Sequence, residues 1–363
     1  MSDKKGNGMK KININTLNKY DFVVGKAILG DIGSFALDIL TPCKICIITD
    51  DNVNYIYGDI VFDSLINAGF EPFIFSFTPG EASKSLATYG ECLEFLAGEK
   101  FTRTDGIISL GGGVSGDLAG FVAATYLRGI KYIQIPTTFL AAVDSSVGGK
   151  TGVNLSHGKN LAGSFWQPSL VLCDTNTFKT LSNEIFLDGV AEAIKYGIIS
   201  DKNLFEKIYT NAPLTASYDA LEDIISACIK IKADLVIEDE RDNGVRQLLN
   251  LGHTIGHAIE KCSNYTISHG HAVATGIAVI TKASHNFGYT DFQSLSFIID
   301  LLQKHGFIIK TSFSVEELFP FILSDKKRGG SNINLILPVK IGFSEIREFP
   351  VNALNGFIKA GLK

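Results

Sequence analysis

Four of the chain's seven histidines lie in the short stretch 253–271: His253, His257, His269 and His271. The first two are four residues apart in a segment with helical character, and a helix would place both imidazoles on one face, one turn apart. Neutral imidazole is the commonest protein ligand for zinc-like metals, and it titrates near neutral pH. The cluster therefore indicates a metal site or proton-transfer chemistry. Spacing alone would pair His253 with His257 as two ligands.

A run of glycines occupies residues 110–120, directly after an apolar segment that reads as a buried strand. Glycines let backbone amides approach a phosphate closely, and the N-terminus of a following helix favours an anion. Parallel sheets bind ligands at the carboxyl ends of their strands. The run is not the usual G-x-G-x-x-G fingerprint of the first βα turn. By itself it predicts either a nucleotide site or a tight structural turn.

A second polar segment covers residues 136–160 and is rich in glycine, hydroxyl groups and lysine. Its portion 147–151 resembles a P-loop, but Asp144 stands where the first glycine belongs, which disfavours a P-loop NTPase. Lysine, asparagine and hydroxyl side chains among glycines suit a phosphorylated, hydroxylated ligand. The alternative is an exposed polar loop.

Further charged residues lie just before the histidines. Glu192 and Lys195 would project to the same side of a helix, and this spacing alone favours a surface ion pair. Lys232, Arg246 and Asn250 come next along the chain. Converging lysine and arginine suit a carboxylate on the substrate, although each cation taken separately reads as a solvated surface charge.

The elements that must position these residues change character along the chain. The first half alternates β-branched strands with helices, which implies right-handed crossovers and a parallel sheet; we expect strands at 45–49, 71–77, 106–110, 131–135 and 170–173, and helices at 57–68 and 83–98. Helical periods dominate from about residue 182, at 184–199, 221–238, 252–261, 271–287 and 294–305, with a short strand at 334–337. We therefore predict an α/β fold: a disordered tail (1–11), a Rossmann-like parallel-sheet domain (12–182) and a mostly α-helical domain (183–363).

Length and composition limit the function classes. A chain of 363 residues is expected to form two domains, and its 45% hydrophobic content is that of a globular protein. The net charge of −5 provides no basic footprint for nucleic acid, and no apolar run is long enough to span a bilayer. The polar N-terminus is not a signal peptide, and the six scattered cysteines are not a disulfide framework. We expect a cytoplasmic protein without nucleic-acid or membrane partners.

Taken together, the segments resemble the 3-dehydroquinate synthase family of the sugar phosphate cyclases. The resemblance runs from about residue 50 to 337. Each motif alone is weak, but the ordered series is specific, and its members are residues 79–84, 111–117, 126–129, 136–138, 143–151, 158–160, 191–197 and 249–260.

The resemblance implies an NAD-dependent carbon–oxygen lyase that uses one divalent metal, zinc or cobalt. Its substrate would be 3-deoxy-D-arabino-heptulosonate 7-phosphate. The reaction would proceed by transient oxidation, phosphate elimination, reduction and intramolecular aldol closure to 3-dehydroquinate, a step of the shikimate pathway. The implied metal ligands are Glu192, His253 and His269, while His257 is an active-site histidine and not a ligand.

The same correspondence assigns the other positions. The implied catalytic and substrate-binding residues are His257, Lys150, Lys195, Asp144, Asn160 and Arg128, with Lys232, Arg246 and Asn250 at the substrate carboxylate. The implied NAD positions are Asp50, Asn52, Glu81, Lys84, Gly112, Gly113, Asp117, Thr137, Thr138, Lys150, Lys159, Thr180 and Leu181. Arg128 would reach the phosphate of a neighbouring subunit, so a homodimer is expected. Lys326 or Lys327 would also meet the phosphate.

The chain departs from the family at His271, where the family often has glutamate in the sequence His-Gly-Glu-Ala-Val. Tuning of the metal from outside its ligand shell is one interpretation. Two rival functions remain at this point, another sugar phosphate cyclase and a metal-dependent polyol dehydrogenase. Lys232, Arg246 and Asn250 argue against a substrate that has no carboxylate. A third alternative, an NAD-binding scaffold without activity, is disfavoured by the presence of the expected charged positions.

Overall fold

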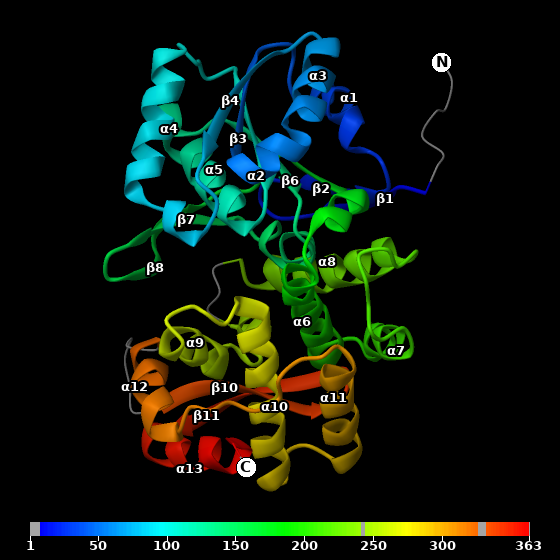
Figure 1. Cartoon of the computed structure of the whole chain (residues 1–363), viewed down its shortest axis with the longest axis vertical. Coiled ribbons are helices and arrows are strands. Elements are labelled where there is room, and N and C mark those ends of the chain that lie inside the picture. The colour runs from blue at the N-terminus through cyan, green and yellow to red at the C-terminus, as the bar shows by residue number, and fades with distance from the viewer. Residues whose placement is uncertain (1–7, 241–243, 326–331, 363) are drawn as a thin grey trace. The chain divides into compact units, whose positions relative to one another are not determined.

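The computed structural model describes residues 8–240, 244–325 and 332–362 (Figure 1). The chain divides into two compact units. The first contains Met1–Leu181 and Asp219–Ala233, and the second contains Ser182–Tyr218 and Asp234–Lys363. The segment 219–233, which the sequence division placed in the helical domain, thus belongs to the first unit.

A seven-stranded sheet forms the centre of the first unit, in the order β1-β2-β9-β6-β5-β3-β4. Every neighbouring pair is parallel except β1 and β2, which are antiparallel. The strands are β1 (Lys10–Ile14), β2 (Tyr20–Gly25), β3 (Lys44–Asp50), β4 (Glu71–Phe77), β5 (Gly106–Gly111), β6 (Lys131–Pro136) and β9 (Leu170–Asp174). All five strands expected in this half are present, and the predicted α/β class is confirmed.

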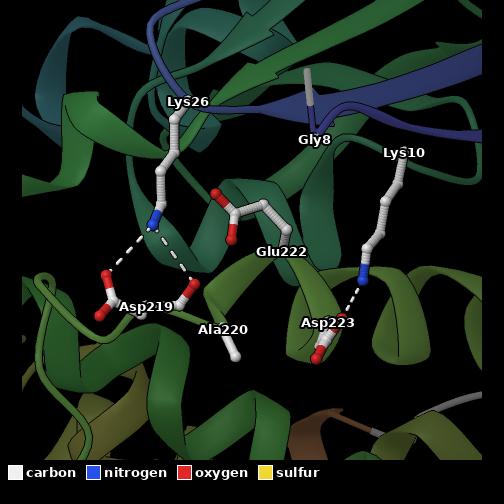
Figure 2. Close-up of a pocket in the computed structure, with 7 residues that line it drawn as sticks. All are labelled: Gly8, Lys10, Lys26, Asp219, Ala220, Glu222 and Asp223. Atoms are coloured by element: carbon white, nitrogen blue, oxygen red, sulfur yellow. Dashed lines mark hydrogen bonds and ion pairs between the residues drawn. The ribbon is translucent and has the colours of Figure 1, made fainter. Parts of the chain in front are cut away.

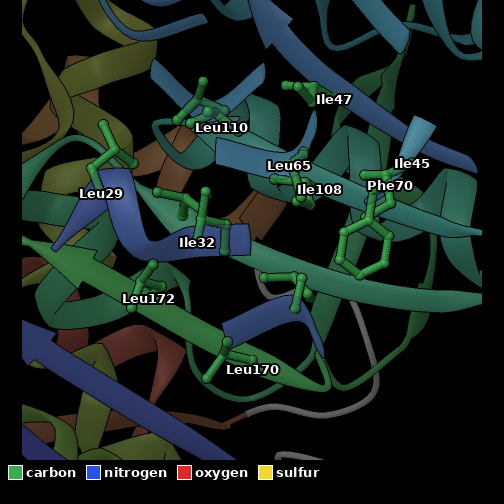
Figure 3. Close-up of a cluster of buried hydrophobic side chains, with 14 of the residues drawn as sticks. Leu29, Ile32, Ile45, Ile47, Leu65, Phe70, Ile108, Leu110, Leu170 and Leu172 are labelled. Carbon is green, nitrogen blue, oxygen red and sulfur yellow. The ribbon is translucent and has the colours of Figure 1, made fainter. Parts of the chain in front are cut away.

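Helices cover both faces of this sheet, as expected for a parallel sheet whose strands are apolar throughout. One face packs against α1 (Ile32–Leu37) and α3 (Asp59–Asn67), through a cluster that includes Ile32, Leu65 and Ile108 (Figure 3). The other face packs against α4 (Leu86–Gly98) and α5 (Gly113–Thr125). Consecutive β3 residues alternate between the two clusters, Ile45 and Ile47 on one side and Cys46 and Ile48 on the other.

The N-terminal hairpin and a second hairpin differ from the sequence reading. Residues 1–7 lie outside the described part, but β1 begins at Lys10, inside the predicted tail, because its pairing with β2 buries Ile12 and Ile14. The polar segment predicted around residues 144–160 contains strand β7 (Lys150–Leu155), which pairs with β8 (Gly158–Phe165) in a separate antiparallel sheet.

The order of the strands fixes where a ligand can bind. The chain goes from β3 outward to β4, then returns to the opposite side of β3 to form β5. In open parallel sheets, ligands bind at the carboxyl ends of the strands where the order reverses in this way. Asp50 ends β3 and Gly111 ends β5, so two predicted site positions lie at this point.

The second unit is mostly helical. Its helices are α6 (Asn183–Ile199), α7 (Lys202–Thr210), α9 (His253–Cys262), α10 (His269–Asn286), α11 (Phe292–Lys304), α12 (Val315–Asp325) and α13 (Val351–Leu362). Helix α8 (Leu221–Glu238) continues from the first unit into the second. A β10–β11 hairpin (Asn332–Lys340, Phe343–Pro350) replaces the single short strand that the sequence predicted.

Helices α9 and α10 pack with their backbones in close contact. A Cβ atom on Gly276 of α10 would lie 2.1 Å from the carbonyl oxygen of Gly252, the residue that precedes α9. Any larger residue at position 276 would push the two helices apart. The glycine therefore brings the first turns of α9 and α10, and with them His253 and His269, into one neighbourhood.

A small cleft of about 340 Å³ lies in the first unit beside the start of α8 (Figure 2). Its lysines are paired with acids, Lys10 with Asp223 and Lys26 with Asp219. These pairs tie the N-terminal strands to the segment 219–233. Among the described residues, none of the helices has the length and apolarity that a membrane span requires.

Candidate functional site

The glycine run forms the turn from β5 into α5. Gly111 has a φ of +153°, and the backbone N–H of Thr137 donates to its carbonyl at 2.9 Å. A Cβ atom on Gly112 would lie 3.0 Å from a side-chain atom of Thr138, so the two predicted NAD segments are adjacent. Asp50 caps the next helix by accepting from the N–H of Val53 at 3.0 Å. The N-terminus of α5 and these polar groups form an edge suited to a phosphate-bearing nucleotide.

A buried lysine organises a second part of the first unit. Lys84 is only 4% exposed, and its ammonium contacts the carboxylate of Asp117 and the amide oxygen of Asn160. Burial raises the pKa of Asp117, and the Lys84 charge opposes that shift. Nearby, the Asn154 amide donates to Glu81 at 2.8 Å. Four predicted positions, Glu81, Lys84, Asp117 and Asn160, are thus linked through direct contacts and Asn154.

The remaining predicted positions of the first unit are more dispersed. Lys232 is 5% exposed and its ammonium lies 2.9 Å from Asp144, so the reading of a solvated surface charge is wrong for this residue. The hydroxyl of Thr180 lies 2.8 Å from that of Tyr57, and Leu181 follows it. Exposed positions are found at Asn52, Arg128, Lys150 and Lys159.

Glu192 and Lys195 form an ion pair on α6, as the spacing predicts, but this pair is not on the surface. The side chain of Glu192 is 0% exposed and that of Lys195 is 1% exposed. Two charges that are this deeply buried are costly unless further partners compensate them. The expectation of a surface pair is therefore wrong, because α6 is covered on this face by the packing of the second unit.

Two histidines face the buried carboxylate of Glu192. The Nε2 atoms of His253 and His269 each lie 3.6 Å from its Oε1 atom. The candidate ligand atoms of these three residues all lie within 4.8 Å of one another. One carboxylate and two imidazoles are a donor set that zinc-like metals use, and catalytic sites of this type keep a further position open. The residues therefore fit the metal that the resemblance implies.

Hydrogen bonds orient both rings for this role. The Nδ1 atom of His253 lies 3.1 Å from the carbonyl oxygen of Leu251, and Nδ1 of His269 lies 3.5 Å from Glu260. Each contact occupies Nδ1 and leaves Nε2 directed at Glu192, which is how metal-ligating histidines are usually held.

The two histidines differ in their proton affinity when no cation lies between them. Burial and the nearby Lys195 charge lower the pKa of His253 to about 3. Burial also acts to lower the pKa of His269, but hydrogen bonds to Glu192 and Glu260 and their charges outweigh it and raise that pKa to about 10. A proton on His269 therefore partly fills the role that a metal cation would take against these carboxylates.

His257 belongs to a second possible donor group. Its ring centroid is 5.4 Å from that of His253 and 6.0 Å from that of His269. His257, Glu260 and His269 also have ligand atoms within 4.8 Å of one another. All four groups around His269 thus lie together, and a metal could occupy one donor set while the other orients it.

The last predicted positions lie near these histidines or outside the description. Arg246 is 2% exposed and donates to the carbonyl of Glu240 at 2.9 Å, so it is not a solvated surface charge. Asn250 ends the same short helical segment, Val245–Asn250. His271 packs its ring against Phe307, with centroids 5.3 Å apart. Lys326 and Lys327 lie outside the described residues.

Two acidic residues at this site had no role in the sequence reading. Glu260 contacts His269, and Asp188 accepts hydrogen bonds at the start of α10. Glu260 lies three residues after His257, so helical spacing could have indicated it. Asp188 lies about eighty residues before its partners, and only the packing of α6 on α10 brings them together.

Comparison with known proteins places this geometry in a family. The family model described as 3-dehydroquinate synthase N-terminal matches residues 74–188, and the one described as 3-dehydroquinate synthase C-terminal matches residues 189–328. A 3-dehydroquinate synthase from Streptococcus suis is 42% identical over 353 residues, which cover 96% of this chain and 99% of that protein.

Solved structures agree in fold. A 2-deoxy-scyllo-inosose synthase complexed with carbaglucose-6-phosphate, NAD+ and Co2+ has a TM-score of 0.85 at 26% identity and covers 98% of this chain and 100% of that one. A glycerol dehydrogenase from Schizosaccharomyces pombe has a TM-score of 0.63 at 17% identity, covering 98% and 91%, a similarity of fold alone. The family resemblance predicted from the motifs is confirmed, and the chain belongs to the 3-dehydroquinate synthase family.

Proposed function

We propose that this chain is a lyase that converts 3-deoxy-D-arabino-heptulosonate 7-phosphate to 3-dehydroquinate and phosphate, in the shikimate pathway. The observation that carries the proposal is the buried Glu192 carboxylate facing the Nε2 atoms of His253 and His269, in a chain 42% identical to a 3-dehydroquinate synthase over nearly its whole length. A glutamate with no exposed surface, aimed at two oriented imidazoles, has little structural purpose without a cation.

The proposal assigns NAD to the first unit and one divalent metal, zinc or cobalt, to the second. The implied NAD positions gather around the glycine turn, Asp50 and the Lys84 cluster, and the metal ligands are Glu192, His253 and His269. When bound, NAD would supply reversible hydride transfer and the metal would polarise the oxygens of the substrate. A solved relative of similar fold contains both kinds of group, NAD+ and Co2+.

Chemistry explains why a lyase would need such groups. Phosphate leaves poorly from an unactivated carbon, but a ketone next to that carbon makes its neighbouring C–H acidic. Elimination then breaks the C–H bond and the C–O bond to phosphate, so one proton must be taken up. His257 is placed to handle a proton, since it lies beside the ligand histidines without being needed among them.

Cationic and amide side chains would hold the substrate during these steps. Lys195 has an ammonium that is buried against Glu192, where it can donate to a hydroxyl of the ring. Lys150, Asn160 and Asp144 keep the roles that the resemblance implies for substrate binding. The proposal also retains the carboxylate contacts of Lys232, Arg246 and Asn250, and burial of Lys232 and Arg246 supports them because few ordinary surface cations are so enclosed.

Two rival functions share parts of this site. Another sugar phosphate cyclase would act on a substrate without a carboxylate, and the 26% identity to an inosose synthase is well below the 42% identity to a 3-dehydroquinate synthase. A polyol dehydrogenase would share the fold, but its similarity extends to the fold alone. The synthase is therefore the better supported function.

The assay that tests the proposal follows phosphate and NADH together. With the heptulosonate phosphate, the purified protein should release phosphate without net accumulation of NADH, because each hydride removed is returned. Treatment with a chelator should lower the rate by at least about a hundredfold, and added Zn²⁺ or Co²⁺ should restore it. Accumulation of NADH from glycerol would favour the dehydrogenase. Preference for a hexose phosphate without a carboxylate would favour another cyclase.

We further propose a homodimer in which Arg128 acts on the phosphate bound by the partner subunit. Leu127 and Arg128 have φ values of 50° and 67°, a left-handed conformation that non-glycine residues rarely adopt and that tends to persist at functional sites. Among the described residues, the guanidinium of Arg128 has no hydrogen bond or ion pair, and the side chain is exposed. This loop therefore holds a cation outward, available to a second chain.

Mixing two inactive variants tests this role. Arg128→Ala and His257→Ala proteins, unfolded and refolded together, should regain about a quarter of wild-type activity, because half of the dimers are mixed and each mixed dimer contains one intact site. Each variant refolded alone is the control. Absence of any recovery in dimers that have demonstrably exchanged subunits would place Arg128 in its own subunit's site. A cytoplasmic location remains part of the proposal, supported by six free thiols.

A further inference from the structure

The helix that begins with a proposed metal ligand lacks the usual cap from its own sequence. His269 is the first residue of α10, and Ser268 precedes it with an extended backbone, φ −68° and ψ 162°, which is the conformation of an N-cap residue. The Ser268 side chain nevertheless accepts no hydrogen bond from the first turn. Backbone N–H groups at a helix start need acceptors, and without them the first turn frays.

The sequence also lacks the reciprocal half of a capping box. In that motif a serine at the N-cap is followed three residues later by glutamate or glutamine, which accepts from the N-cap backbone N–H. His271 occupies this third position, and its ring packs against Phe307. Its buried Nε2 atom has no hydrogen-bond partner among the described residues. The imidazole thus takes no part in capping.

An acidic residue from another helix supplies the missing acceptor. The Oδ1 atom of Asp188, on α6, accepts from the backbone N–H of Gly270 at 2.8 Å and from that of His271 at 3.3 Å. It also accepts from the hydroxyl of Ser268 at 2.6 Å. These two N–H groups are the ones that an N-cap side chain normally satisfies. Asp188 therefore performs the capping function from eighty residues away.

The same contact fixes the distance between the two helices. A Cβ atom on Gly270 would lie 2.3 Å from the Cα of Asp188 and 2.4 Å from its carbonyl oxygen. Only glycine at position 270 allows this approach. Asp188 and Glu192 are four residues apart on α6, so they lie on one face of that helix. One carboxylate holds the start of α10, and the other faces the imidazole of the first residue of α10.

From this geometry we infer that Asp188 is a positioning residue for the metal centre: it caps α10 from α6 and so sets His269 against Glu192, in place of the capping box that His271 cannot complete. The inference rests on the proposed function only in taking Glu192, His253 and His269 as the metal ligands. It gives the unusual histidine at position 271 a consequence, since the cap must then come from elsewhere.

Metal affinity of the apoprotein tests this inference. Competition with a chromophoric chelator should show that Asp188→Ala binds Zn²⁺ about 10- to 100-fold more weakly than wild type, the usual cost of losing a group that orients a ligand. The visible spectrum of the Co²⁺-loaded variant should also change, because His269 would meet the metal at an altered angle. Wild-type affinity and an unchanged Co²⁺ spectrum in this variant would overturn the inference.

A matched control separates positioning from general stability. Asp291 caps α11, accepting from the N–H of Ser294 at 2.7 Å, in the same unit but on a helix that carries no proposed ligand. Asp291→Ala should lower the thermal midpoint much as Asp188→Ala does, yet leave Zn²⁺ affinity within about threefold of wild type. An equal loss of affinity in both variants would mean that destabilisation alone accounts for the effect, and would overturn the inference.

Rescue through position 271 is the most specific test. Adding His271→Glu to Asp188→Ala rebuilds the capping box with Ser268 and should return Zn²⁺ affinity to within about threefold of wild type. No recovery in the double variant would overturn the capping account. If Asp188→Ala fails to fold, Asp188→Asn keeps an acceptor oxygen and should bind Zn²⁺ within about threefold of wild type; a loss of about tenfold or more would contradict the inference.

These outcomes are distinct from failure of the proposed function. A wild-type protein that binds no divalent metal would remove the metal centre itself. A wild-type protein that binds Zn²⁺ tightly, alongside an Asp188→Ala variant that binds equally tightly, would leave the proposed function intact and remove only the role of Asp188.

Discussion

Replacing Glu192 with alanine should remove the metal and reduce phosphate release by about 10³-fold, because loss of a Lewis acid costs several kcal/mol of transition-state stabilisation and each 1.4 kcal/mol is about a factor of ten. The two remaining imidazoles, His253 and His269, would lack the carboxylate that each of them faces at 3.6 Å. Metal content measured on the purified variant, together with its rate of phosphate release, checks this result. A fully occupied metal in Glu192→Ala would refute the role of Glu192.

The alanine variant has a second effect that must be separated from the first. Lys195 is 1% exposed and paired with Glu192, so removing the carboxylate leaves a buried ammonium without its main partner, at a cost of about 3–5 kcal/mol. Glu192→Gln is the matched control, since its amide oxygen can still accept from Lys195 while the charge that binds the metal is gone. We expect Glu192→Gln to be more stable than Glu192→Ala and equally poor in metal.

The strand pattern of the first unit could be predicted because its signal is local. Runs such as Ile45–Ile48 are β-branched and apolar, and they are buried on both faces wherever a parallel sheet is covered by two helix layers. The hairpins β1–β2 and β7–β8 were not predicted, because polar residues and glycines interrupt their apolar pattern. Their stability comes from pairing with distant or newly formed strands, which a local pattern does not encode.

The site could be predicted only in part, for a similar reason. Helical spacing correctly places Glu192 and Lys195 on one face, but it cannot say whether that face is covered, and the structure buries both residues. The same spacing would make His253 and His257 a ligand pair. Which histidines face a carboxylate depends on how α6 packs against α9 and α10, and the motifs of the family supplied that information where spacing could not.

Asp188 marks the limit of what a single sequence can provide. Its neighbourhood on α6 carries no capping signal, because its partners are the backbone N–H groups of a helix eighty residues later. The only local indication is negative: Ser268 is followed at the third helical position by His271 in place of glutamate or glutamine. An incomplete capping box predicts that an acceptor is needed but not where it comes from.

Replacing His257 with alanine should leave the metal in place while lowering turnover by about 10²- to 10⁴-fold, the usual contribution of a group that transfers a proton in the transition state. The reason is geometric. Glu192 offers its carboxylate to His253 and His269, and His257 lies beside them with its ring centroid 5.4 Å from that of His253. Metal analysis and the rate of phosphate release on the same preparation check both halves of the prediction.

The His257 and Glu192 variants together decide between the two donor sets. If the metal is instead held by His257, Glu260 and His269, whose ligand atoms also lie within 4.8 Å of one another, then His257→Ala loses the metal and Glu192→Ala keeps it. The opposite pattern is expected here, since Glu192 is completely buried and both Nε2 atoms are directed at it, while Glu260 contacts Nδ1 of His269 and so orients that ring. Partial recovery of His257→Ala activity by added imidazole, at unchanged metal content, would further identify His257 as the group that moves the proton.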